Sequence, residues 1–186
     1  MKELPLSYDS CIETLKETSW DDDNDIYVSS SDLEVYNFDK VKKKYYEDSN
    51  LDKGVMIASC DALYIHNETE IYLIEFRNAA LSILAEGTKK REIKDKNIDS
   101  LFIYQDIVCC GISQTRENVH FILVYDDAKT EIRNKQRVRS GQKIKELDLS
   151  KYEGICYKRC LKVQINFDKT AVTNGKLVGQ QRFEGM

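Results

Sequence analysis

Two short apolar segments joined by a polar turn constrain the fold of this chain more than any other feature. Residues 55–65 and 71–76 are strand-like in length and composition, and together they predict an antiparallel β-hairpin. If the turn is symmetric about Glu68, Leu63 lies opposite Leu73, and the same rule aligns the rest of the two strands. The sequence therefore predicts both a hairpin and its register.

This register places two carboxylates directly opposite each other. Asp61 faces Glu75, and opposed side chains in a sheet have β-carbons roughly 4.5–5.5 Å apart, so like charges there require compensation. Arg77 shares the face of Glu75, because strand side chains alternate between faces. Mg²⁺ commonly uses one or two carboxylates together with water and substrate phosphate. We therefore predict Asp61 and Glu75 as metal ligands, with Arg77 stabilising the charge on a phosphate.

An alternative interpretation of the same residues is purely structural. In that case Asp61 lies at a strand edge, and Glu75 pairs internally with Arg77 or with a nearby lysine. The sequence leaves both interpretations open.

The remaining patterns predict a single α/β domain over residues 1–186 with a central mixed β-sheet flanked by helices. Helices are expected at residues 7–20, 32–46 with Asp32 as N-cap, 79–108 with a break at Gly87, and 131–147. Strands are expected at residues 118–125, apolar enough to be buried on both faces, and 161–167, and residues 173–186 form a polar tail.

The hairpin residues resemble a known family. Asp61, thirteen further residues, and then Glu75-Phe76-Arg77 within apolar strands are similar to the motif of the PD-(D/E)XK phosphodiesterase superfamily, which includes restriction endonucleases. The resemblance covers residues 32–167 and implies a restriction-endonuclease-like fold. It also implies that Asp61 and Glu75 bind Mg²⁺, for which Mn²⁺ can substitute, and that Arg77 occupies the position of the motif lysine. Glu34, in the predicted preceding helix, is similar in placement to an accessory glutamate of many members.

Two positions depart from the family pattern. Cys60 stands where a proline often precedes the first acidic residue. Arg77 replaces the lysine that positions or activates water, and with a pKa above about 12 an arginine holds a phosphate but does not readily act as a base. Lys94 and Lys96, on the helix that follows the motif, are candidates to contact phosphate, and solvated helix surface is the alternative.

The charge distribution supports two kinds of partner. A net charge of −4 argues against a protein that coats nucleic acid by charge alone. The charge is nevertheless uneven along the chain, with an acidic cluster at residues 21–25 and a basic stretch at residues 133–145. Solvated surface is the simplest interpretation of both segments. One functional hypothesis is a metal-dependent nuclease, whose basic segment contacts nucleic acid. The other is a catalytically lapsed scaffold that binds a basic protein such as a toxin, as immunity proteins or antitoxins do.

Other classes of protein are disfavoured. No apolar stretch approaches the roughly 20 residues that cross a bilayer, so we expect no membrane association and a cytoplasmic location. Six cysteines without Cys-x-x-Cys spacing indicate reduced thiols rather than a zinc site or a disulfide scaffold. The two histidines lack partners at ligand spacing, and a glycine-rich phosphate loop with its lysine is missing from the sequence.

Overall fold

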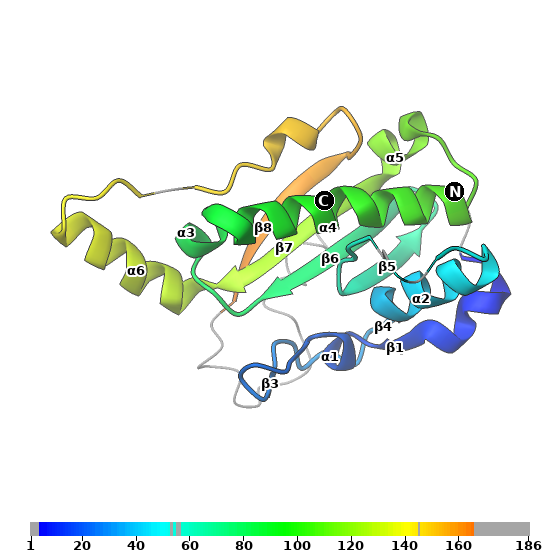
Figure 1. Cartoon of the computed structure of the whole chain (residues 1–186), viewed down its shortest axis with the longest axis horizontal. Helices are drawn as coiled ribbons and strands as arrows, with labels where there is room; N and C mark the ends of the chain where they lie inside the picture. The colour runs from blue at the N-terminus through cyan, green and yellow to red at the C-terminus, as the bar shows by residue number, and fades with distance from the viewer. Residues whose placement is uncertain (1–3, 53, 55–56, 145, 166–186) are drawn as a thin grey trace.

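The computed structural model describes residues 4–52, 54, 57–144 and 146–165, and within them the main feature is a six-stranded mixed β-sheet (Figure 1). The strand order is β1-β4-β5-β6-β7-β8. The strands are β1 (Ile12–Thr14), β4 (Glu34–Asn37), β5 (Ala62–Asn67), β6 (Glu70–Arg77), β7 (Val119–Asp126) and β8 (Arg159–Ile165). The first four strands pair antiparallel, whereas β6, β7 and β8 run parallel. A separate two-stranded hairpin is formed by β2 (Trp20–Asp21) and β3 (Ile26–Tyr27).

Helices lie mainly on one face of this sheet. The longest, α4 (Gly87–Ile107), crosses the front of β6 and β7 in Figure 1, and α2 (Phe38–Asp48) lies beside it. The other helical segments are η1 (Leu6–Cys11), α1 (Leu15–Thr18), α3 (Leu81–Leu84), α5 (Ile112–Asn118), α6 (Asp127–Arg139) and η3 (Ser150–Tyr152). Together with the mixed sheet, these helices confirm the predicted mixed α/β class.

The register of the central hairpin agrees with the prediction. Leu63 pairs with Leu73 and Ile65 pairs with Ile71, as a turn symmetric about Glu68 requires. The turn itself differs, because Asn67 pairs with Glu70 and an irregularity after Ile65 takes up the extra residue. The irregularity is confined to the exposed tip, so the pairing nearer the core keeps the predicted alignment.

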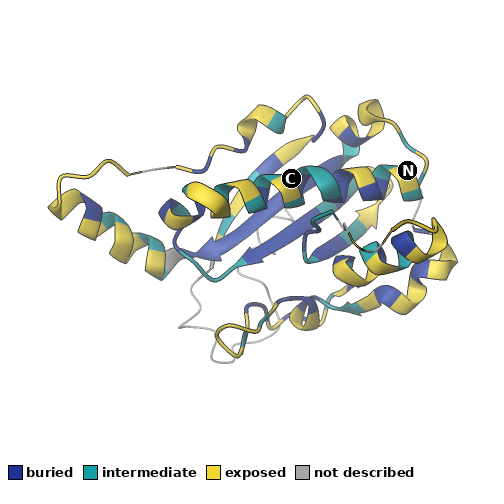
Figure 2. Cartoon of the chain, in the orientation of Figure 1, coloured by how far each residue is buried: buried dark blue, intermediate teal, exposed yellow. Residues whose placement is uncertain are grey.

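Two hydrophobic clusters cover the two faces of the sheet. The cluster beneath α2 and α4 includes Leu63, Leu73, Phe121, Phe38 and Leu101, and the cluster on the opposite face includes Ala62, Ile74, Ile122, Val124 and Leu15. All eight residues of β7 are buried, as the dark central strands of Figure 2 illustrate. The prediction of a strand buried on both faces is thus confirmed, and β6 beside β7 is nearly as enclosed.

The N-terminal third was predicted wrongly in two places. In place of a helix over residues 7–20, the chain forms η1, β1 and α1 in succession. In place of a helix from Asp32, it forms β4, and α2 begins only at Phe38. Asn37 caps α2, since its side chain accepts a hydrogen bond from the Lys40 amide at 3.1 Å. Pairing of β4 with β1 and β5 outweighs the weak helical spacing in this segment.

Later boundaries moved by smaller amounts. The break predicted at Gly87 is confirmed, because this residue has φ of +49° and begins α4 after α3 has ended. The predicted 131–147 helix corresponds to α6, but both of its ends were predicted wrongly. It begins earlier, because Asp126 caps it through the Lys129 amide at 2.9 Å, and it ends at Arg139 rather than at Leu147. Strand β5 begins at Ala62 rather than at residue 55, and α5 was not predicted. Residues 166–167 of the last predicted strand and the 173–186 tail lie outside the described residues.

No helix in the described part of the chain is both long and apolar enough to span a membrane.

Candidate functional site

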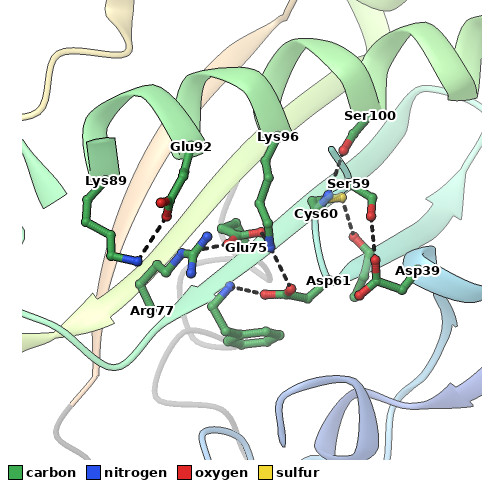
Figure 3. A network of polar contacts seen from close by, with 12 residues as sticks. Asp39, Ser59, Cys60, Asp61, Glu75, Arg77, Lys89, Glu92, Lys96 and Ser100 are labelled. Atoms are coloured by element: carbon green, nitrogen blue, oxygen red, sulfur yellow. Dashed lines mark hydrogen bonds and ion pairs between the residues drawn. The ribbon is translucent and has the colours of Figure 1, made fainter. Parts of the chain in front are cut away.

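The hairpin brings the two predicted carboxylates together at the base of β5 and β6. Asp61 immediately precedes β5, where the regular pairing with β6 ends at Ala62 and Ile74, and its amide donates a hydrogen bond to the Ile74 carbonyl at 3.0 Å. Glu75 and Arg77 follow on the face of β6 that packs beneath α4, and Figure 3 shows these side chains converging there. The predicted meeting of Asp61 and Glu75, with Arg77 beside them, is therefore present in the structure.

A lysine from α4 lies between the two carboxylates. The Lys96 ammonium is 3.2 Å from Asp61 Oδ1, 3.0 Å from Glu75 Oε2 and 2.9 Å from Glu75 Oε1 (Figure 3). On the other side, Arg77 Nε lies 2.8 Å from Glu75 Oε1. Two acidic and two basic side chains thus form one compact cluster, which we call the carboxylate cluster: Asp61, Glu75, Arg77 and Lys96.

Burial changes the pKa values of the acidic side chains in this cluster. The Glu75 side chain is completely buried, while those of Asp61, Lys96 and Arg77 keep exposed fractions of 20%, 22% and 24%. Burial, followed by the adjacent charge of Asp61, raises the pKa of Glu75 to about 8. Burial also raises the pKa of Asp61 above its ordinary value, although Lys96 opposes this effect.

The negative charges of Glu75 and Asp61 raise the pKa of Lys96. Burial by itself lowers the pKa of Lys96, but Glu75 and Asp61 outweigh it and raise the pKa above the ordinary value for lysine. Lys96 is therefore a cation across the physiological range. In this cluster it is a hydrogen-bond donor and a source of positive charge rather than a base.

Side chains from two helices hold the segment that leads into Asp61. The Ile57 amide donates to Tyr46 Oη of α2 at 3.0 Å, and the Ala58 amide donates to Asp99 Oδ2 of α4 at 2.9 Å. Because residues 57–61 belong to no strand, these bonds satisfy amides that a sheet would otherwise pair. The segment is thereby fixed to the scaffold without secondary structure of its own.

A second set of contacts fixes the two residues next to Asp61. Ser59 Oγ donates to Asp39 Oδ1 at 2.5 Å and accepts from Lys42 Nζ at 2.6 Å, while the Cys60 amide donates to Ser100 Oγ at 2.7 Å (Figure 3). Asp61 Oδ2 in turn accepts from the Phe76 amide at 2.6 Å. The Asp61 carboxylate is thus oriented by the Phe76 amide of β6 and by the contacts that fix the two residues before it.

The Cys60 bond gives a physical reason for the missing proline. Cys60 is fully buried, and its amide needs the acceptor that Ser100 provides. A proline at this position has no amide hydrogen and leaves the Ser100 hydroxyl without its donor. The departure from the family pattern is therefore coupled to a serine on α4, 40 residues later in the sequence.

The accessory residues predicted from the sequence are only partly present at the site. Lys96 belongs to it, whereas Lys94, two residues earlier on α4, lines a different pocket on the other flank of the helix. The helical placement of Glu34 is wrong, because this residue lies exposed on β4 and opposite Thr14 of β1. The helix carboxylate near Asp61 is instead Asp39, in the first turn of α2, where the Asn37 cap is the sequence signal for the true helix start.

A pocket of about 400 Å³ opens beside the carboxylate cluster. Asp61, Arg77 and Lys89 line it on one side, and Trp20 with the acidic residues 21–23 lines it on the other. Three residues of the acidic cluster identified in the sequence, Asp21, Asp22 and Asp23, thus line the same pocket as Asp61. Their carboxylates disfavour the unassisted approach of a phosphate and favour a cation.

The donor set is compatible with a hard divalent cation. Asp61 and Glu75 supply two converging carboxylates, which matches the number that Mg²⁺ commonly takes from protein. Among the described residues, no group of three or more histidine, cysteine, aspartate or glutamate side chains converges on one point, so water and substrate would complete the coordination. Lys96 occupies the position between the carboxylates and competes with any metal for them.

Comparison with known proteins identifies no relative, because neither a protein-family model, a curated protein nor a solved structure matches this chain.

Replacing Ser100 with alanine is expected to lower the free energy of unfolding by about 1–3 kcal/mol, because the buried Cys60 amide then has no acceptor. Ser82→Ala is the matched control, since Ser82 is equally buried and its hydroxyl has no hydrogen-bond partner among the described residues. Urea unfolding of both variants measures the difference. Equal losses in the two variants would contradict the role assigned to Ser100.

The raised pKa of Glu75 predicts a stability that depends on pH. The folded state holds the Glu75 proton more tightly than the unfolded state does. Protonated Glu75 therefore adds to the free energy of unfolding, fully at pH values below the ordinary pKa of 4.5, and this gain is lost as pH rises towards about 8. Urea unfolding between pH 5 and 8, with EDTA present, should show a slope of at most about 1.4 kcal/mol per pH unit from this group.

Glu75→Gln is expected to flatten that slope, because glutamine does not titrate. Glu131→Gln, which changes an exposed glutamate on α6, serves as the control and should keep the wild-type slope. A Glu75→Gln profile parallel to that of the wild type would show that Glu75 does not carry the pH dependence.

Proposed function

We propose that this chain is a divergent member of the PD-(D/E)XK superfamily, with a restriction-endonuclease-like fold, and that it hydrolyses phosphodiester bonds in nucleic acid with the help of Mg²⁺. The observation that supports the proposal best is the convergence of Asp61 and Glu75 on one point beside two cations. The mixed sheet with α2 and α4 on one face is compatible with it. The six free cysteines suit the reducing cytoplasm, where such a protein would act.

In this proposal Asp61 and Glu75 hold the metal ion. Bound Mg²⁺ would polarise a phosphoryl oxygen and lower the pKa of a coordinated water. The carboxylate oxygens are already oriented for ligation, since the Phe76 amide fixes Asp61 and the Arg77 guanidinium contacts Glu75. Orientation before binding reduces the entropy that is lost when the ligands are fixed.

Lys96 supplies the ammonium group that the motif places two residues after the glutamate. Arg77 stands at that position in this sequence, and Lys96 reaches the same carboxylate from α4 instead. Neither side chain is suited to accept a proton, because Lys96 has a raised pKa and arginine is always charged. Both can donate hydrogen bonds to phosphate oxygens as negative charge develops there.

A second candidate function is a catalytically lapsed scaffold that binds a basic protein, such as a toxin. The specific observation in its favour is that Lys96 and Arg77 already neutralise the two carboxylates without a metal. The acidic residues 21–23 that line the pocket would then attract a basic partner and accelerate its association. In this case the carboxylate cluster has only a structural role.

Digestion of supercoiled DNA and of RNA with Mg²⁺ or Mn²⁺ tests the nuclease directly. Asp61→Ala, Glu75→Ala and Lys96→Ala are each expected to lower the cleavage rate at least about 100-fold, because each removes a ligand or a stabilising charge. Glu70→Ala, at the far end of β6, and Lys43→Ala, on the exposed side of α2, should cleave at the wild-type rate. Circular dichroism confirms that each variant is folded, and cleavage that survives all three site substitutions would remove the cluster from the mechanism.

Titration calorimetry with Mn²⁺ separates the two candidate functions. The nuclease should bind the ion saturably, and Glu75→Gln should abolish the binding. Lys96→Met should bind the ion more tightly than the wild type does, because the ammonium no longer competes for the carboxylates. No heat of binding in the wild type, under conditions where the protein is folded, favours the lapsed scaffold.

A further inference from the structure

A second pocket lies on the flank of α4 that faces away from the carboxylate cluster. Its volume is about 450 Å³, and its main lining residues are Lys90, Arg91 and Lys94 of α4 together with Tyr152 of η3. Successive helix residues are rotated by about 100°, so Lys94 lies about 160° around α4 from Lys96. The two sites are therefore separated by the helix itself, which with its side chains is about 10–12 Å across.

The three cations that line this pocket form no ion pairs with the described residues. Within the described part of the chain, none of Lys90, Arg91 and Lys94 forms an ion pair, in contrast to Lys89, which lies 3.1 Å from Glu92, and to Lys96. Their mutual proximity is consistent with the lowered pKa of Lys94, which results from burial and then from the charges of Lys151 and Lys90. The pocket thus gathers three cations that form no ion pair within the described part of the chain.

An aromatic ring lines the pocket, and a further cation lies near it. Tyr152 belongs to the lining, and Lys151 Nζ lies 4.5 Å from the centroid of its ring and lowers the pKa of Lys94. The two carboxylates in the lining are Asp95 and Asp99, and Asp99 already accepts a hydrogen bond from the Ala58 amide. The lining therefore carries three cations and two carboxylates, and Lys151 and Asp148 act on Lys94 from nearby with opposite charges, which leaves a small excess of positive charge in a chain whose net charge is −4.

The other basic segment of the chain is less suited to bind an anion. On α6, Arg137 is buried and paired with Glu86, and Lys135 lies 3.3 Å from Glu131. Lys145, at the end of the basic stretch predicted from the sequence, lies outside the described residues. Two cations of the basic stretch are thus already paired, whereas Lys90, Arg91 and Lys94 on α4 form no ion pair within the described part of the chain and line one pocket.

We propose that the pocket formed by Lys90, Arg91, Lys94 and Tyr152 binds backbone phosphates of a polynucleotide whose scissile bond lies at the carboxylate cluster. This inference rests on the proposed nuclease function and adds to it a second surface that binds the substrate. A single strand or duplex must cross the N-terminal half of α4 to touch both sites, so several nucleotides are needed. Residues 21–23, which line the pocket beside the carboxylate cluster, repel phosphate, and the basic pocket on α4 supplies attraction.

Fluorescence anisotropy with labelled 20-nucleotide DNA and RNA, single-stranded and duplex, tests the inference with the full chain in EDTA. The double variant Lys90→Ala/Lys94→Ala should bind at least about 10-fold more weakly than the wild type at moderate salt. The slope of log affinity against log salt concentration should decrease by about 2, because two phosphate contacts are lost. Lys16→Ala/Lys43→Ala removes the same charge from exposed positions elsewhere and should change the affinity less than about 2-fold.

Hydrolysis of bis(p-nitrophenyl) phosphate separates this inference from the proposed function. This small diester reaches only the carboxylate cluster, so Lys90→Ala/Lys94→Ala should hydrolyse it at the wild-type rate while cleaving polynucleotide more slowly. Pocket-dependent binding without any hydrolysis would refute the nuclease and leave the phosphate surface intact. Equal losses of affinity in the two double variants would overturn the phosphate surface, and so would a wild type that binds polyglutamate but no nucleic acid.

Discussion

The structure depends on the burial of two carboxylates side by side at the base of a β-hairpin. Transferring a charged group from water into a protein costs several kcal/mol, and two like charges in contact add repulsion to that cost. Asp61 and Glu75 are tolerated because Lys96 approaches from α4 and Arg77 from the same strand. The cluster therefore ties the sheet to its longest helix, and even with both cations in contact, burial and the Asp61 charge keep the pKa of Glu75 raised to about 8.

The need to orient these charges explains the irregular segment before β5. Residues 57–61 give up regular strand pairing and receive hydrogen bonds from α2 and α4 instead. Ser100 is the clearest case, because it binds a buried amide one residue from Asp61. A segment held by side chains from two helices stays rigid without strand neighbours, which is the property that a preorganised site requires.

Charge is distributed unevenly around α4. Residues 21–23 line the pocket beside the carboxylate cluster, and Lys90, Arg91 and Lys94 of α4 line the basic pocket. An anionic polymer is repelled at the first location and attracted at the second. Under the proposed function, the basic pocket attracts nucleic acid to a chain of net negative charge, whereas under the second candidate function residues 21–23 attract a basic protein.

The sequence by itself determined the hairpin and the register of its inner pairs, because strand alternation across a short turn is a local property. The same alternation placed Asp61 and Glu75 on one face, where both contact Lys96. The sequence also indicated the buried strand β7 and the break at Gly87. Only the tertiary structure decided that residues 34–37 form a strand rather than a helix, since partner strands outweighed weak helical spacing. Likewise, which lysine of α4 reaches the carboxylates depends on how the helix is rotated over the sheet, and that rotation is fixed by packing.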